Sequence, residues 1–219
     1  AGQAKLFDLA RLDPSTPLYI RYAIGTNFRG RPLYDQPRAF LVQPAAKALA
    51  RAHKAAAAEG YGLTIFDAYR PWRITKALWD ATPPGQQRNY VANPKKGSKH
   101  NRGCAVDLSL HRLDTGALVE MPSGYDEFTE RAHRDFMAAS PEAIANRARL
   151  EGWMEAEGFR GISNEWWHFD FAGWEDFPIL DIAFSEIRQH SRRTSRTSQG
   201  SAASRRGSPS AWSSRGRSP

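Results

Sequence analysis

Two polar segments that lie far apart in the chain carry the groups that metal-assisted hydrolysis requires. His100 and Asp107 belong to the segment SKHNRGCAVD, and Glu165 and His168 belong to the segment EWWH. Two imidazoles and one carboxylate can bind a divalent metal such as zinc and leave a position open for water, and a second acid can act as the general base. The residue types therefore indicate a candidate metal centre, provided that the fold brings both segments together.

Each of these residues also has an ordinary structural explanation. Asp107 lies in an apolar segment, where a carboxylate is costly unless it is paired, hydrogen-bonded to backbone amides or bound to a metal. His100 could be a surface residue, and His168 could be a core histidine. Glu165 adds a geometric condition, because residues i and i+3 of a regular strand point to opposite faces. It can share a site with His168 only from the loop before the strand or through a β-bulge.

Two further charged residues are compatible with a hydrolase. Arg70 ends a buried apolar segment, where its guanidinium could stabilise a developing oxyanion or form a structural ion pair with Asp67. Asp126, in the segment GYDEF, could bind a substrate ammonium group or be an ordinary loop acid. The other histidines lack such neighbours, and we expect them at the surface: His53, His111, His133 and His190.

The elements that must position these residues follow no regular repeat. Residues 43–59 are rich in Ala and end at Gly60, which predicts a helix with a glycine C-cap. The segment that starts at Ser140-Pro141-Glu142 has the N-cap and first-turn pattern of a second helix, continuing to Glu157. Short strands are predicted at Leu18–Tyr22, 62–69, 104–110 and 165–171. Because strands and helices mix without a βαβ repeat, the predicted fold class is α+β.

Composition limits the domain organisation and the partners. The 219 residues allow one domain or two small ones, and no apolar run reaches the roughly 20 residues of a membrane helix. Most of the net charge of +8 comes from residues 191–219, which contain seven Arg and no acid among many Ser and Gly. Such a tail cannot bury enough apolar surface to repay the entropy of ordering. We expect one domain over residues 1–187, a disordered tail over 188–219 and no nucleic-acid partner; a basic binding arm is the alternative for the tail.

Several motifs occur together and in a specific order. SxHxxGxAxD is complete from Ser98 to Asp107, and ExWH is complete from Glu165 to His168. The flanking segments RYA, GYGL, DAYRP and LDTG extend the pattern over most of the chain. In this combination the sequence resembles the D-alanyl-D-alanine dipeptidases of the vancomycin-resistance type, in the zinc peptidase family M15.

The resemblance implies both a fold and a reaction. The fold is α+β, with a central antiparallel sheet flanked by helices. The reaction is hydrolysis of a small D,D-dipeptide such as D-Ala-D-Ala, with a role in the metabolism of peptidoglycan. One Zn²⁺ per chain would be bound by His100, Asp107 and His168.

The resemblance also implies roles for other residues. Glu165 would be the general acid/base, taking a proton from the attacking water and passing it to the departing amine. Arg70 would stabilise the oxyanion. Tyr22 and Asp126 match positions near the substrate amino terminus, and Ser98 matches another position of the substrate pocket.

Two other functions stay open. A related zinc enzyme could act on peptidoglycan stems as a D,D- or L,D-carboxypeptidase or as an endopeptidase, with a more open cleft. A noncatalytic module could keep the zinc fold for binding, although the presence of Glu165 argues against it. The long polar loop from Pro83 to Lys99, together with Asp126, favours a closed pocket for a free amino terminus. The compartment would be the bacterial cytoplasm or, after removal of a leader, the periplasm.

Overall fold

The computed structural model describes residues 5–187 except 13, 26, 28 and 86–90. These residues belong to the first of two units into which the chain divides, Ala1–Gln189. The predicted disordered tail, residues 188–219, lies outside the described residues, as does part of the loop after Pro83. Within the described part, no helix is long and apolar enough to cross a membrane.

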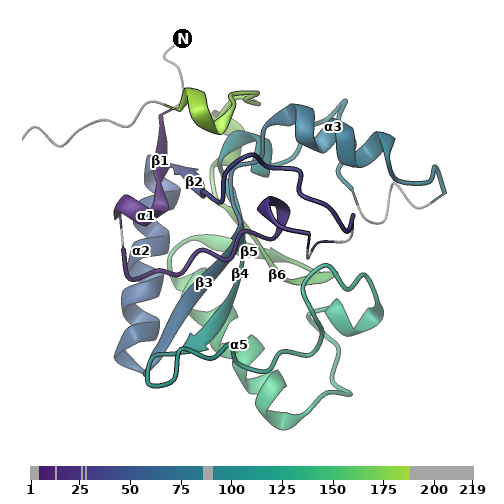
Figure 1. Ribbon diagram of the computed structural model, residues 1–219. Coiled ribbons are helices and arrows are strands. Elements are labelled where there is room, and N and C mark those ends of the chain that lie inside the picture. Colours follow the sequence, from purple (N-terminus) through teal and green to yellow (C-terminus); the bar gives the residue numbers. More distant parts are fainter. Residues whose placement is uncertain (1–4, 13, 26, 28, 86–90, 188–219) are drawn as a thin grey trace, which may run out of the picture. The chain divides into compact units, whose positions relative to one another are not determined.

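A four-stranded antiparallel sheet forms the centre of the described unit, with the strand order β3–β4–β6–β5 (Figure 1). Its strands are β3 (Tyr61–Asp67), β4 (Ala105–Arg112), β5 (Phe159–Ile162) and β6 (Glu165–Phe171). β4 pairs with β3 on one side and with β6 on the other, so Asp107 is opposite both Asp67 and His168. The register therefore places three polar residues in one row across the sheet. With its flanking helices, this sheet confirms the predicted α+β class.

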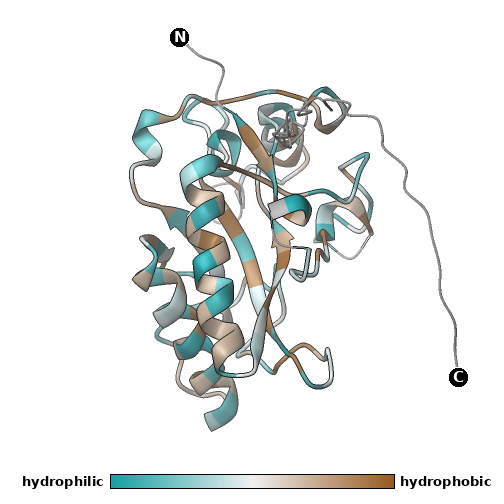
Figure 2. Cartoon of the chain, turned by 90° about the vertical axis from the view of Figure 1, so that its left-hand side faces the viewer, coloured by the Kyte–Doolittle hydropathy of each residue, from teal (hydrophilic) through white to brown (hydrophobic). Residues whose placement is uncertain are grey.

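Two long helices flank the sheet. α2 (Gln43–Ala58) packs against β3, and α5 (Pro141–Ala156) contacts both α2 and β5. Their ends follow the predicted signals: Gly60 has a φ of 84° after α2, and Ser140 Oγ accepts a hydrogen bond from the N–H of Ala143 (3.1 Å) at the start of α5. Figure 2, which views the molecule from the α2 side, shows hydrophilic residues recurring along this helix and more hydrophobic strands behind it.

Shorter elements complete the described unit. β1 (Leu6–Asp8) pairs antiparallel with β2 (Phe40–Val42), and α1 (Leu9–Leu12) follows β1 directly. α3 (Trp72–Asp80) begins shortly after β3. Single 3₁₀ turns lie at Arg21–Ala23, His100–Arg102, Glu130–Ala132, Trp174–Asp176 and Phe184–Glu186.

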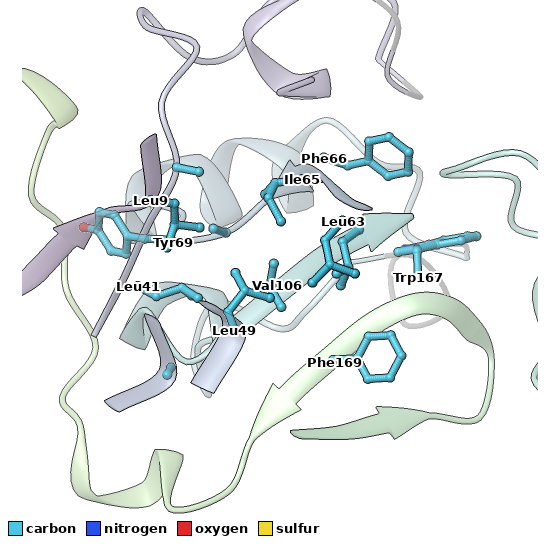
Figure 3. Packing of buried hydrophobic residues seen from close by; sticks show 14 of the residues in the cluster. Leu9, Leu41, Leu49, Leu63, Ile65, Phe66, Tyr69, Val106, Trp167 and Phe169 are labelled. Carbon is cyan, nitrogen blue, oxygen red and sulfur yellow. The ribbon is translucent and has the colours of Figure 1, made fainter. Parts of the chain in front are cut away.

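Buried apolar residues join the sheet to its helices (Figure 3). Leu49 of α2, Leu63 of β3 and Val106 of β4 are at most 3% exposed, and Trp167 and Phe169 of β6 at most 1%. Burial of a large apolar side chain stabilises a fold by roughly 1.5–3 kcal/mol. This core therefore fixes β4 and β6, the strands that carry two of the candidate metal ligands.

One predicted strand is absent. Leu18 makes only an isolated bridge to β3, and Arg21–Ala23 forms a 3₁₀ turn. The strand predicted over Leu18–Tyr22 is therefore wrong. The chain turns here because the Asn27 side-chain amide donates hydrogen bonds of 2.8 and 3.1 Å to two carbonyl groups of this loop. The turn leaves Tyr22 buried, at the cavity described below.

Two histidines predicted at the surface are buried instead. His53 Nδ1 accepts a backbone N–H bond from β3, and His111 Nδ1 lies 2.9 Å from Thr64 Oγ1. Their partners come from other elements, which is why local sequence gave no signal. Ser15 Oγ lies 3.2 Å from His53 Nε2, but this nitrogen carries the proton because Nδ1 is an acceptor, so the pair lacks a general base. His133 is exposed, as predicted.

Candidate active site

Three buried side chains form the candidate metal centre. His100 lies in the 3₁₀ turn before β4, Asp107 in β4 and His168 in β6. The donor atoms are separated by 3.2 Å (His100 Nε2 to His168 Nδ1), 3.0 Å (His168 Nδ1 to Asp107 Oδ1) and 3.4 Å (His100 Nε2 to Asp107 Oδ1). Ligands about 2.1 Å from one tetrahedral zinc ion lie roughly 3.4 Å apart. The three residues therefore fit a zinc ion.

Hydrogen bonds on the outer side of each ring decide which nitrogen faces this centre. His100 Nδ1 lies 2.7 Å from the carbonyl oxygen of Ala68. Because a carbonyl can only accept, Nδ1 carries the proton and Nε2 is left for a metal. His168 Nε2 lies 2.8 Å from Asp170 Oδ1, which leaves its Nδ1 facing the centre. Lys99 Nζ, 3.3 Å from the other oxygen of Asp170, balances the charge of that acid.

The charges of Asp107 and His168 support each other. Burial opposes ionisation of both groups, but the two histidines lower the pKa of Asp107, and hydrogen bonds with Asp107 and Asp170 raise the pKa of His168 to about 10. Tyr125 Oη donates a hydrogen bond to Asp107 Oδ2 (3.0 Å), on the side of the carboxylate away from His168. The surroundings thus favour positive charge at the centre, as a cation site requires.

Backbone geometry fixes the turn that carries His100. Gly103 ends this turn with a φ of 66°, and a Cβ at this position would lie 2.7 Å from Leu6 Cδ2 and 3.3 Å from the backbone nitrogen of Val42. Glycine is therefore required both by conformation and by close packing. Ser98 Oγ accepts a hydrogen bond from the N–H of His100 (3.1 Å) at the start of the same turn.

A β-bulge brings Glu165 and His168 to the same site. Gly161 and Ile162 are adjacent on β5, yet their partners on β6 are Phe169 and Glu165. The three residues between these partners on β6, residues 166–168, therefore lie outside the regular pairing with β5. Of the two arrangements predicted for Glu165, the bulge is the one observed: Glu165 belongs to β6, and its Oε2 lies 3.9 Å from His168 Nδ1. Burial raises the pKa of Glu165.

Arg70 forms the ion pair with Asp67 and lies at the cavity as well. Its Nε (3.1 Å) and Nη2 (2.7 Å) both donate to Asp67 Oδ2, while Tyr34 Oη donates to Asp67 Oδ1 (2.8 Å). The guanidinium carbon lies 4.9 Å from the ring centroid of Tyr22. The backbone N–H of Arg70 donates to the carbonyl of His100 (3.1 Å). Arg70 is thus held in one orientation next to a candidate ligand, with Nη1 outside the ion pair.

Asp126 is a half-buried acid in the wall of the cavity. Its φ of 59° is the only positive value for a non-glycine residue in the described part of the chain. Its Oδ2 is buried and has no hydrogen-bond partner among the described residues. Burial, and secondarily the charge of Asp107, raise the pKa of Asp126 well above its usual value. A cationic group would stabilise such a carboxylate.

All the residues that the sequence singled out for the site line one cavity of about 270 Å³. Val91, Phe128 and Trp167 add apolar wall to it. This volume lies below the range of cavities that take drug-sized molecules, so the cavity suits a small ligand. The residues from the sequence are Tyr22, Arg70, Ser98, His100, Asp107, Asp126, Glu165 and His168.

Sequence reasoning missed four residues of the site. Asp170 and Lys99 support His168, Tyr125 supports Asp107, and Tyr34 supports the acid that holds Arg70. Alternation along β6 places Asp170 on the same face as His168, a signal that could have identified it. The two tyrosines reach the site from loops, where spacing carries no such signal.

A buried set of two histidines and one carboxylate, with a further acid beside it in a small polar cavity, is the arrangement that a metal-dependent hydrolase requires. Comparison with known proteins makes the class specific. Residues 2–188 match the peptidase M15 family described as D-ala-D-ala dipeptidase, and the chain belongs to this family of zinc metallopeptidases.

The similarity to two named relatives covers most of the chain. The D-alanyl-D-alanine dipeptidase of Escherichia coli (strain K12) is 39% identical and covers 83% of this chain and 92% of its own length. The enzyme of the same name from Enterococcus faecium is 37% identical, over 73% of this chain and 90% of its own length. Among solved structures, VanYB in complex with D-Alanine-D-Alanine aligns with a TM-score of 0.42 and 17% identity, over 65% of this chain and 77% of that one.

Proposed function

We propose that this protein hydrolyses D-alanyl-D-alanine and similar free D,D-dipeptides with one zinc ion bound by His100, Asp107 and His168. The proposal is carried by the meeting of these three donors with an unpaired acid, Asp126, in one small cavity. The names of the relatives at 37% and 39% identity support the choice of substrate. The spacing of the donor atoms supports the choice of metal.

Glu165 is proposed as the general base. Zinc, when bound, would act as a Lewis acid and lower the pKa of a water molecule bound to it from about 15.7 toward 7. Glu165 Oε2, close to the ligand atom of His168, accepts a proton from the attacking water and passes it to the nitrogen of the departing amine as the peptide bond breaks. The burial that raises the pKa of Glu165 makes it a stronger base than an exposed glutamate.

Arg70 and Asp126 are proposed to hold the two ends of the reacting group. Arg70, fixed by Asp67 through Nε and Nη2, donates from Nη1 to the scissile carbonyl oxygen as negative charge develops there. Asp126 accepts the substrate ammonium group. Tyr22 packs against the Arg70 guanidinium at the substrate amino terminus, and Ser98 completes the pocket wall.

The substrate assay separates this proposal from its alternative. The zinc-loaded protein is incubated with D-Ala-D-Ala, with N-acetyl-D-Ala-D-Ala and with muropeptides that end in D-Ala-D-Ala, and products are measured by liquid chromatography with mass detection. We expect cleavage of the free dipeptide and little cleavage of the others, because Asp126 requires a cation. Preferred release of D-alanine from muropeptides would instead identify a peptidoglycan-stem carboxypeptidase.

The role of Glu165 has its own test. Substitution Glu165→Gln keeps the shape of the side chain and removes the basic oxygen, so we expect kcat to fall by about 10²–10⁴-fold. Zinc content, measured by plasma mass spectrometry, should stay at one ion per chain. A variant that retained most of its kcat would exclude Glu165 as the base.

A further inference from the structure

The side chain of Arg134 lies against the bulge of β6. Its Nε donates to the carbonyl oxygen of Ile162 (2.9 Å), and its Nη2 donates to the carbonyl oxygens of Trp166 (3.2 Å) and His168 (2.9 Å). The guanidinium carbon also lies 4.3 Å from the ring centroid of Phe169. One side chain, far away in sequence, thus contacts both strands where their register shifts.

A guanidinium is suited to this place because the bulge interrupts the ladder of the sheet. Carbonyl groups that lose their strand partners need other donors when they are buried. Arg carries several N–H groups in a rigid planar fork, so one side chain can serve three carbonyl oxygens. The ammonium group of lysine is a single point and cannot span them in the same geometry.

The neighbouring backbone leaves room for this guanidinium. A Cβ at Gly161 would lie 2.0–2.3 Å from the Cζ, Nε and Nη2 atoms of Arg134. On the opposite side, Arg134 Nη1 lies 3.1 Å from Glu151 Oε1 of α5. Gly161 therefore leaves the space that the Arg134 guanidinium fills, and the carboxylate of Glu151 attracts the same guanidinium from α5.

The bulge controls Glu165 more strictly than it controls His168. The His168 ring is held independently, by Asp170 at Nε2 and by Asp107 at Nδ1. Among the described residues, no hydrogen bond holds the Glu165 carboxylate, and its ion pair with His168 Nδ1 spans 3.9 Å, so its position depends mainly on its backbone. A shift of the bulge would therefore displace the Glu165 carboxylate while His168 kept its place.

We propose that Arg134 is a positioning residue, which holds the β6 bulge and thereby directs the Glu165 carboxylate toward the metal centre. The proposal rests on the function proposed above for Glu165. It assigns a role in turnover to a side chain that does not line the cavity. Arg134 acts through the carbonyl groups of the bulge and touches neither substrate nor metal.

Two variants test the proposal by different routes. Arg134→Lys keeps the positive charge and removes the planar guanidinium with its several N–H donors. Gly161→Ala keeps Arg134 and displaces its guanidinium, which is the movable end of a long side chain. For both we expect kcat for D-Ala-D-Ala to fall at least about 10-fold, since misplacement of a catalytic group by about 1 Å can lower rates by up to 10²-fold. The zinc dissociation constant, from competition with a chelator, should change by less than about 3-fold, below the effect typical of lost ligand support.

Arg38→Lys is the matched control. Arg38 also lies over an aromatic ring, pairs with an acid and donates to a backbone carbonyl, but it is bound to β1 and to the segment near Phe184. We expect it to lower the melting temperature without lowering kcat. In the metal-free protein, amide hydrogen exchange of the peptide that contains residues 165–170 should accelerate in both test variants and stay unchanged in Arg38→Lys.

The combination with Glu165→Gln distinguishes positioning from general loss of structure. If Arg134 acts through Glu165, then Arg134→Lys should lower kcat no further in the Glu165→Gln background. Three results would overturn the proposal for Arg134. The first is an Arg134→Lys effect on kcat that is as large in the Glu165→Gln background as in the unmodified protein. The others are an unchanged kcat in both test variants, or a loss of zinc affinity that parallels the loss of kcat. Unchanged kcat in Glu165→Gln itself would instead overturn the proposed function.

Discussion

At the scale of single residues, three acids around one cavity have pKa values that move in different directions. The histidines that contact Asp107 lower its pKa, whereas burial raises the pKa of Asp126 and of Glu165. Groups of the same chemistry are thereby prepared for different tasks. These directions agree with the roles proposed above: a metal ligand at Asp107, a proton acceptor at Glu165 and a partner for the substrate ammonium group at Asp126.

Asp126 gives the first prediction at this scale. Asp126→Asn removes the charge and keeps the shape, so we expect KM for D-Ala-D-Ala to rise by about 10–100-fold, the equivalent of roughly 1.4–2.8 kcal/mol. The folded protein should become more stable, because a carboxylate is removed whose Oδ2 is buried without a hydrogen-bond partner among the described residues. Steady-state kinetics and thermal unfolding measure both effects. A KM equal to that of the unmodified protein would argue against contact between Asp126 and the substrate.

Asp170 gives the second prediction at the residue scale. Carboxylates that hold the outer nitrogen of a ligating histidine typically contribute 10–100-fold to metal affinity, so Asp170→Asn should raise the zinc dissociation constant by about that factor. Chelator competition measures the constant. Lys99→Met is the control: it removes the partner of Asp170 but keeps the bond to His168, and we expect a smaller change. Equal effects of the two variants would contradict this interpretation.

At the scale of elements, the parts that local chemistry governs were predictable. α2 and α5 begin and end close to the cap signals in the sequence, and the apolar and alternating patterns of β3, β4 and β6 located these strands to within a few residues. The predictions failed where a distant partner decides. Asn27 turns the segment that alternation predicted as a strand, and β3 supplies the contacts that bury His53. Sequence alone could not decide between a bulge and a loop at Glu165. The bulge is bound by Arg134, which lies far from β5 and β6 in the sequence, so local spacing carries no signal for it.

The turn that carries His100 allows a prediction for an element. Gly103→Ala places a side chain at a φ of 66° and in contact with Leu6 and Val42, so we expect a loss of more than about 1 kcal/mol in the free energy of unfolding, which lowers Tm by at least roughly 2–4 °C. Zinc affinity should fall as well, because the turn positions a ligand. Gly116→Ala is matched, since Gly116 has a φ of 71° and nothing within 4 Å. It should lose stability and keep its zinc affinity.

At the scale of the whole molecule, the cavity draws on nearly the full length of the described unit. Its lining starts at Tyr22, includes Arg70 after β3 and Asp107 of β4, and finishes at Asp170 of β6. No continuous half of the chain contains the site. Formation of the cavity is therefore coupled to folding of the complete sheet, and metal binding should stabilise the unit as a whole.

The remaining chain supplies the prediction at this scale. All proposed site residues lie in the first compact unit, Ala1–Gln189, and the Arg- and Ser-rich segment follows it. We expect a protein that ends at Gln189 to keep kcat, KM and zinc content within about 2-fold, a change of roughly 0.4 kcal/mol or less. Side-by-side kinetics of the two lengths test this expectation. A marked loss of activity in the shorter protein would assign a catalytic or stabilising role to the tail.

The two histidines of the candidate metal centre present different ring atoms to it: Nε2 in His100 and Nδ1 in His168. Nδ1 lies near the backbone end of an imidazole, whereas Nε2 lies at its far end, so the two side chains differ in reach. An asparagine extends about as far as Nδ1, and a glutamine about as far as Nε2. We therefore expect the two positions to tolerate different replacements, because glutamine at position 100 and asparagine at position 168 would each keep a donor atom near the centre. The opposite exchange leaves one donor too short and makes the other too long.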